Sequence, residues 1–134
     1  MPRPASQHPT DLELEVLKAL WRLGPATVRQ VRDALAAGAP SSPPRDLAYT
    51  SVMTVLTIMT NKGYARRAKG DGGYVYRAKV ARGSTVGRML RDLVERAFSG
   101  SAGAAALNLL ESSEVTPEEL RQLRELIDRK QRRP

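Results

Sequence analysis

The chain has 134 residues, and its 22 Lys and Arg against 14 Asp and Glu give a formal net charge of +8. With no Cys and a single His, it lacks the residues for disulfides, thiolate metal sites, cysteine nucleophiles and histidine-based catalytic triads. There is also no apolar run long enough to cross a membrane and no apolar core of a signal peptide. We therefore expect a cytoplasmic protein without membrane insertion that is not an enzyme and needs no metal or cofactor.

Residues 1–9 are rich in proline and are predicted to form a disordered tail, which contains the single histidine, His8. The next segment opens with the capping box of Thr10 and Glu13, which predicts a helix start. Glu13 and Glu15 are two positions apart on this helix and do not face each other, so we interpret them as surface charges and not as a catalytic carboxylate pair.

A second helix is predicted to start at Thr27, where Gln30 completes another capping box. It ends at Gly38, and residues 38–46 form a loop by composition. Two capped helices and a loop leading to a third helix form the tri-helical arrangement that presents its last helix to a DNA groove.

That third helix lies within Leu47 to Arg67 and is predicted to stop at Gly63. At the helical step of about 100° per residue, its apolar side consists of Val52, Val55, Leu56 and Met59. The opposite side carries threonines in place of the usual Lys, Glu and Arg, although threonine lowers helix propensity. Such a face suits close approach to a polar surface, and we interpret it as the part that reads the major groove, with Thr50, Ser51, Met53, Thr54 and Thr57 as DNA-binding candidates.

A β-hairpin is predicted next, because two short segments, 64–69 and 74–78, flank the Gly-rich sequence of residues 70–73. Residues 62–82 carry seven basic side chains against Asp71 alone, and residues 1–83 as a whole have a net charge of +7 against +1 for residues 84–134. A basic hairpin after a helix-turn-helix is a wing that holds phosphates, and this adds Lys62, Arg66, Arg67 and Lys69 to the DNA-binding candidates.

The last 51 residues are predicted to form three short helices, beginning at Ser84, Ala102 and Thr116. So small a segment can hardly bury its own leucines, so a second copy of the chain is the expected partner, with packing onto its own N-terminal part as the alternative. The dimerisation candidates are Val86, Leu90, Leu93, Val94, Ala97, Phe98, Leu110, Leu123, Leu126 and Ile127.

The order of elements and several residue runs resemble the penicillinase repressor family of bacterial winged-helix regulators. The matching runs, between Thr10 and Ile127, are residues 13–17 with Leu20 and Trp21, residues 27–31, residues 47–56 with Lys62 and Gly63, and residues 106–111. The resemblance implies a homodimer on an inverted-repeat operator in double-stranded DNA, repressing resistance genes of the β-lactam type. A copper-responsive branch of the family uses cysteines, which this chain lacks.

The resemblance also implies that repression is relieved when a signal from a membrane sensor metalloprotease leads to cleavage in the dimerisation part, at an Asn–Phe bond. The corresponding bond here is Asn108–Leu109, where leucine replaces the family's phenylalanine. The predicted fold class is α+β, mainly α: a winged helix-turn-helix domain over 1–83 and an all-helical dimerisation domain over 84–134. The alternatives are a winged-helix module that binds an acidic protein and a regulator that senses a small molecule directly.

Overall fold

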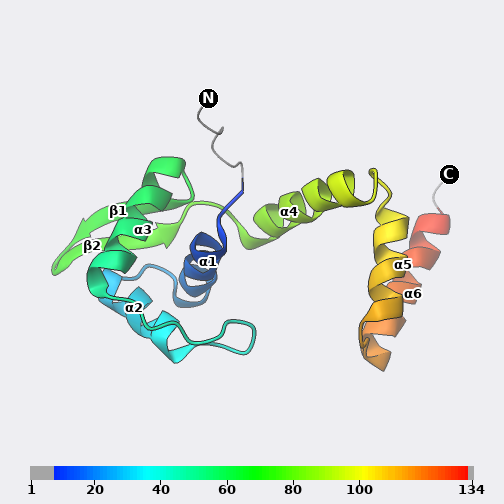
Figure 1. Cartoon of the computed structure of the whole chain (residues 1–134), viewed down its shortest axis with the longest axis horizontal. Coiled ribbons are helices and arrows are strands. Elements are labelled where there is room, and N and C mark those ends of the chain that lie inside the picture. The colour runs from blue at the N-terminus through cyan, green and yellow to red at the C-terminus, as the bar shows by residue number, and fades with distance from the viewer. Residues whose placement is uncertain (1–7, 133–134) are drawn as a thin grey trace. The chain divides into compact units, whose positions relative to one another are not determined.

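The computed structural model describes residues 8–132, in which six helices and one two-stranded sheet are found (Figure 1). In chain order they are α1 (Asp11–Leu23), α2 (Val28–Ala37), α3 (Tyr49–Lys62), β1 (Ala65–Gly70), β2 (Gly73–Ala78), α4 (Arg82–Ala97), α5 (Ala102–Ser112) and α6 (Pro117–Gln131). The structure confirms the predicted fold class, a mainly helical chain with a small antiparallel sheet.

The chain divides into two compact units, Met1–Met89 and Leu90–Pro134, so the division falls inside α4. The boundary expected between residues 83 and 84 lies near the start of that helix. Of the tail expected at residues 1–9, positions 1–7 lie outside the described residues, whereas His8 is half-buried and Pro9 is buried.

The N-terminal unit is built on one hydrophobic core to which α1, α2, α3 and the hairpin all contribute. Residues at helical spacing point inward from each helix, and Ala65 and Tyr76 seal the core from the sheet side. Its most buried side chains include Val16, Leu17, Leu20, Val31, Val52, Leu56, Met59 and Tyr76. The sheet is tied to the helices by two backbone hydrogen bonds between Ala26 and Tyr76, of 2.9 and 2.7 Å.

Local signals set the helix ends in this unit. The capping boxes at Thr10 and Thr27 are both formed, each with reciprocal bonds of about 3 Å between the cap and the third helical residue. Helix α3 ends at Gly63, whose φ of 88° is in the left-handed region that glycine adopts without steric cost. This turn sends the chain directly into β1.

The hairpin pairs β1 with β2 from Ala65 opposite Ala78 to Gly70 opposite Gly73, so Asp71 and Gly72 form the connection. The predicted hairpin is thereby confirmed.

The C-terminal unit has little interior of its own. Among the described residues from Leu90 onward, Ala105 is the one buried apolar residue, at 8% exposed, and α6 has no buried residue. Helices α5 and α6 lie side by side, connected by a short turn (Figure 1), and line an apolar groove of about 560 Å³. The break between α4 and α5 is at Ser99 and Gly100, which both have positive φ.

Candidate nucleic-acid interface

Helix α3 presents the predicted face to solvent. Thr50, Ser51, Met53 and Thr54 are exposed, and Thr57 is half-buried, while Val52, Leu56 and Met59 are fully buried on the other side. Exposed Ile58 extends the face at one edge. The division of the helix into a buried apolar side and an exposed hydroxyl-bearing side therefore holds.

The threonines of α3 are tied to their own helix. The Thr54 hydroxyl donates to the Thr50 carbonyl oxygen and the Thr57 hydroxyl to that of Met53, both at 2.9 Å. Thr60, at the edge of the face, makes the same kind of bond to Leu56 at 2.8 Å. Threonine in a helix commonly donates four residues back in this way, and the bond holds the side chain in one rotamer.

The register of the hairpin separates its basic residues onto two faces. Arg67 is opposite Tyr76 and Lys69 is opposite Tyr74, and directly opposed residues point to the same face of a sheet. Because Tyr76 is buried in the core, the side chains of Arg67 and Lys69 leave the strand on the face of the sheet that is turned to the helices. Arg66 is opposite Arg77, and both lie on the outer face.

The basic side chains of the hairpin have no acidic partner among residues 8–132. Arg66 and Arg77 are a like-charged cross-strand pair, which destabilises an isolated hairpin. The Arg67 guanidinium lies over the Tyr74 ring, 4.5 Å from its centroid, in a cation–π contact. Among the ion pairs of residues 8–132, none includes a basic residue of β1 or β2. The hairpin therefore offers concentrated positive charge to an external anion.

Lys62 differs from the other predicted DNA-binding residues, because its ammonium is paired inside the protein. Lys62 Nζ lies 3.0 and 3.2 Å from the two carboxylate oxygens of Glu13, and a third of the Lys62 side chain is exposed. The interpretation of Glu13 as a surface charge was wrong, since this residue is only 4% exposed. Glu15 is half-buried and pairs with Lys18 at 3.1 Å.

Glu13 is ionised despite its burial. Desolvation acts to raise the pKa of its carboxyl, but the hydrogen bond from the Thr10 amide at 2.8 Å and the bonds and charge of Lys62 outweigh it. The pKa is therefore lowered from its ordinary value. This pair connects the first turn of α1 to the last turn of α3 and so helps to fix the position of α3.

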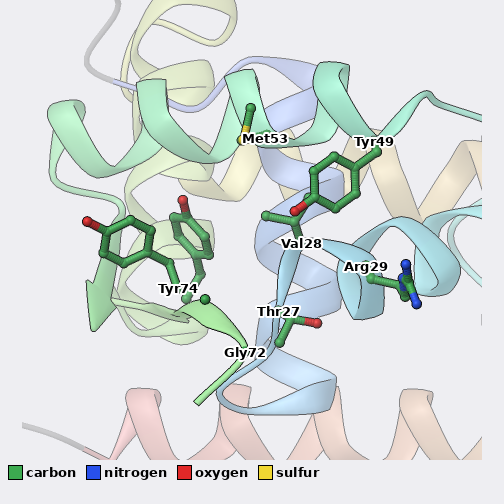
Figure 2. Close-up of a pocket in the computed structure, with 9 residues that line it drawn as sticks. Thr27, Val28, Arg29, Tyr49, Met53, Gly72 and Tyr74 are labelled. Carbon is green, nitrogen blue, oxygen red and sulfur yellow. The ribbon is translucent and has the colours of Figure 1, made fainter. Parts of the chain in front are cut away.

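A hollow of about 550 Å³ lies between the first turns of α2 and α3 and the hairpin. Figure 2 shows Tyr49 beside Val28 at one side, Tyr74 on the hairpin, and Arg29 at the start of α2. Sequence reasoning missed Arg29, Tyr49 and Tyr74 as residues of this surface. In the sequence these two tyrosines and one arginine lie next to the predicted starts of helices and of a hairpin strand. Nothing in that pattern shows that the three residues come together in space.

In the C-terminal unit and along α4, most predicted dimerisation residues are exposed in the single chain. Val86, Leu90, Leu93, Leu126 and Ile127 are 37% to 53% exposed. Ala97 is also exposed, whereas Val94, Phe98, Leu110 and Leu123 are half-buried.

The predicted cleavage bond lies within helix α5. Asn108 is exposed, and its carbonyl oxygen accepts a bond from the Ser112 hydroxyl at 2.7 Å. On either side of Asn108, Leu107 and Leu109 are 62% and 58% exposed in the single chain. Leu110 is half-buried and, with Leu109, lines the groove between α5 and α6.

Three packed helices followed by a hairpin, with the third helix exposed beside it, define a winged helix-turn-helix protein. Residues 9–129 match the model of a family described as penicillinase repressor. The chain belongs to the penicillinase repressor family, which is a family of transcriptional regulators. This membership confirms the resemblance stated from sequence and the prediction that the chain is not an enzyme.

Individual relatives agree with this membership. The chain is 40% identical over 103 residues to the transcriptional regulator BlaI of Mycobacterium tuberculosis, covering 75% of this chain and 70% of that protein. It is 23% identical over 119 residues to the penicillinase repressor of Bacillus licheniformis, covering 89% and 88% of the two chains. It is 20% identical over 118 residues to the methicillin resistance regulatory protein MecI of Mammaliicoccus sciuri, covering 88% and 91%.

Two solved structures are similar to the chain. One is the solution structure of the monomeric form of Bacillus licheniformis BlaI in complex with the blaP half-operator, with 21% identity, a TM-score of 0.45 and coverage of 61% of this chain and 90% of that one. The other is MarR from E. coli, with 15% identity, a TM-score of 0.46 and coverage of 90% and 76%. No helix within residues 8–132 has the length and apolar character needed to cross a membrane.

Proposed function

We propose that the chain is a DNA-binding transcriptional repressor that acts as a homodimer on an inverted-repeat operator of the β-lactam-resistance type. The observation that carries the proposal is the exposed, hydroxyl-bearing face of α3 next to a hairpin whose arginines and Lys69 have no acidic partner among the described residues. A helix of this width and surface fits the major groove, and the cations fit the phosphates that border it.

Within this proposal the residues have different roles. Thr50, Ser51, Met53, Thr54 and Thr57 approach base edges, since residues near the start of a recognition helix reach the bases first. Arg66, Arg67 and Lys69 contact phosphates, which position the protein without reading sequence. Arg77 joins them from β2, because it lies opposite Arg66 on the outer face of the hairpin.

The salt dependence of binding tests the DNA interface. Each phosphate neutralised contributes roughly 0.9 to the slope of log affinity against log salt. We expect Arg66→Ala and Arg67→Ala each to weaken binding to all duplexes about equally and to flatten the slope by roughly that amount. Fluorescence anisotropy with one operator-like and one random duplex, titrated at several salt concentrations, measures both quantities.

Arg129→Ala is the matched control, because it removes one exposed cation from α6 without touching the hairpin. Its slope should equal that of the unchanged chain. A slope near zero for the unchanged chain would contradict DNA binding and favour the alternative, a winged-helix module whose basic hairpin binds an acidic protein.

The homodimer is supported by the weak interior of the C-terminal unit. A unit of 45 residues whose described part holds one buried apolar residue lacks the buried area to be stable alone. Exposed leucines and Ile127 line its helices instead, and apolar side chains grouped at a surface mark an interaction site. A second copy of the chain fits this surface, because in a two-fold symmetric dimer the same apolar residues of both chains pack against each other.

Relief of repression by cleavage at Asn108–Leu109 completes the proposal, with a membrane sensor metalloprotease as the source of the signal. The bond lies inside α5, and a protease needs extended backbone, so cleavage requires local unwinding of this helix. Cleavage would separate α6 from α4 in each chain. The dimer would weaken while the DNA-reading unit stays whole, and the joint binding of two half-sites would be lost.

Direct sensing of a small molecule is the second candidate for relief. The hollow at Tyr49, Met53 and Tyr74 favours it, since about 550 Å³ is within the range of ligand sites and its occupant would stand beside α3. The test adds an extract of induced cells, freed of protease, to the chain bound to its operator DNA. If sensing is direct, the extract releases the intact chain from the DNA. If relief is proteolytic, the intact chain stays bound.

A further inference from the structure

We infer that the middle of α3 recognises A·T pairs through thymine methyl groups, with Thr54 and Thr57 supplying methyls and acceptor oxygens but no hydrogen-bond donors. The inference rests on the proposed function, since it takes the DNA major groove as the partner of this face. It names the base pairs that the recognition helix selects, which family membership leaves open.

The first step concerns the hydroxyl protons. A hydroxyl has one proton to donate, and those of Thr54 and Thr57 are donated to the Thr50 and Met53 carbonyls at 2.9 Å. Their oxygens can therefore only accept from a base. Turning either hydroxyl toward a base acceptor would break its bond to the backbone.

The second step concerns the neighbours of these threonines. Met53 and Ile58 are 41% and 43% exposed, so apolar side chains flank the threonines on both sides. From Thr50 to Ile58 the helix contains no Arg, Lys, Asn or Gln. The bidentate donors that read guanine, and the amides that read adenine, are thus missing from the centre of the face.

The third step compares this face with the base edges. Both kinds of pair present two acceptors and one amino donor in the major groove: guanine N7 and O6 with the cytosine amino group, and adenine N7 and thymine O4 with the adenine amino group. An A·T pair presents the thymine methyl, which packs on apolar groups, and the adenine amino group, which donates to an acceptor oxygen. The acceptor oxygens can accept from the amino group of either pair, so the contact with the thymine methyl is what makes the centre of α3 favour A·T.

The test uses the full chain and a duplex selected by it from a random library. Each thymine in a half-site is replaced in turn by deoxyuridine, which removes only the 5-methyl group in the major groove. Burying one such group is worth about fourfold in affinity, so we expect about fourfold weaker binding at one or more thymines per half-site. Deoxyuridine leaves the minor groove unchanged, so any contact of the hairpin with that groove does not contribute to the measured difference.

Two variants of Thr54 separate methyl from hydroxyl. Thr54→Val keeps the methyl and removes the acceptor oxygen, so it should bind more weakly but should still prefer thymine to deoxyuridine about fourfold at the position it faces. Thr54→Ser keeps the hydroxyl, should bind about fourfold more weakly, and should no longer distinguish thymine from deoxyuridine at the position it faces. Thr60→Ser is the matched control, because Thr60 makes the same backbone bond but lies at the edge of the face, and its thymine preference should be unchanged.

Sequence-specific binding with no effect of deoxyuridine at any position, or a thymine preference that is lost with Thr54→Val as fully as with Thr54→Ser, would overturn the inference and leave the proposed function standing. A chain that selects no sequence from the library, although it is folded and dimeric, would overturn the proposed function itself.

Discussion

Replacing Lys62 decides between two roles for this residue. Sequence predicts that it contacts DNA, whereas the structure pairs it with the buried Glu13 at 3.0 Å. Lys62→Met keeps the length and apolar stem of the side chain and removes its charge. The Glu13 carboxylate, 4% exposed, would then keep the Thr10 amide as its partner but lose the ammonium.

The cost follows from this burial. Leaving a buried charged acceptor short of a partner costs about 1–3 kcal/mol, and the partial exposure of Lys62 argues for the middle of this range, about 2 kcal/mol. In a folding unit of this size that lowers the unfolding midpoint by roughly 8–16 °C. Glu13→Gln should cost less, about 1 kcal/mol, because the Gln oxygen can still accept from Thr10 while Lys62 reaches water.

Thermal unfolding followed by Trp21 fluorescence measures the effect. Trp21 is the single tryptophan, and its indole donates to the Val80 carbonyl at 3.0 Å within the N-terminal unit, so it reports on this unit. The double variant Glu13→Gln/Lys62→Met should be more stable than the sum of the single losses predicts.

The pH dependence supplies an independent check. Because the folded-state pKa of Glu13 is lowered, the pair's contribution is present above the ordinary pKa of a glutamate and is lost as pH falls through the lowered value. Glu13→Gln should show less loss of stability on acidification than the unchanged chain. A Lys62→Met variant with an unchanged midpoint, weaker DNA binding and a flatter salt slope would refute the structural role and restore the prediction from sequence.

The remaining predictions concern the dimer and its release. Leu93→Asp puts an unpaired charge into the proposed dimer surface and should raise the dimer dissociation constant, measured by sedimentation, at least about 100-fold. The control Arg91→Asp, on the charged side of α4, should leave the dimer intact. If the unchanged chain is itself monomeric at micromolar concentration, both expectations are contradicted. Induced cells with the presumed sensor should yield fragments ending at Asn108 and starting at Leu109 by mass spectrometry, and an intact chain under full induction would show that relief works another way.

Several parts of the fold could be predicted from sequence because their causes are local. The capping boxes at Thr10, Thr27 and Thr116 involve residues three positions apart, and all three form. The Gly-rich turn at residues 70–73 defines the hairpin, and the period of the apolar residues in α3 separates its buried side from its exposed side. The resemblance to the family was likewise visible in short runs of sequence, such as residues 27–31 and 106–111.

The candidate site was predictable only in part. The exposed hydroxyl-bearing residues of α3 follow from the helical period, but a count of basic residues treats Lys62, Arg66 and Arg67 alike. The structure gives each a different environment: Lys62 is paired with Glu13, Arg66 lies on the outer face of the hairpin, and Arg67 stacks on Tyr74.

The sequence by itself therefore determined where the helices and the hairpin lie, which side of α3 is buried, and that positive charge is concentrated around the hairpin. Only the tertiary structure decided that Glu13 meets Lys62 across 49 positions of sequence and that Arg29, Tyr49 and Tyr74 line one hollow. The physical reason is that helix ends, turns and periodicity depend on neighbours within a few residues. The partner of a buried charge and the lining of a hollow depend on how whole elements pack, and no local pattern specifies this.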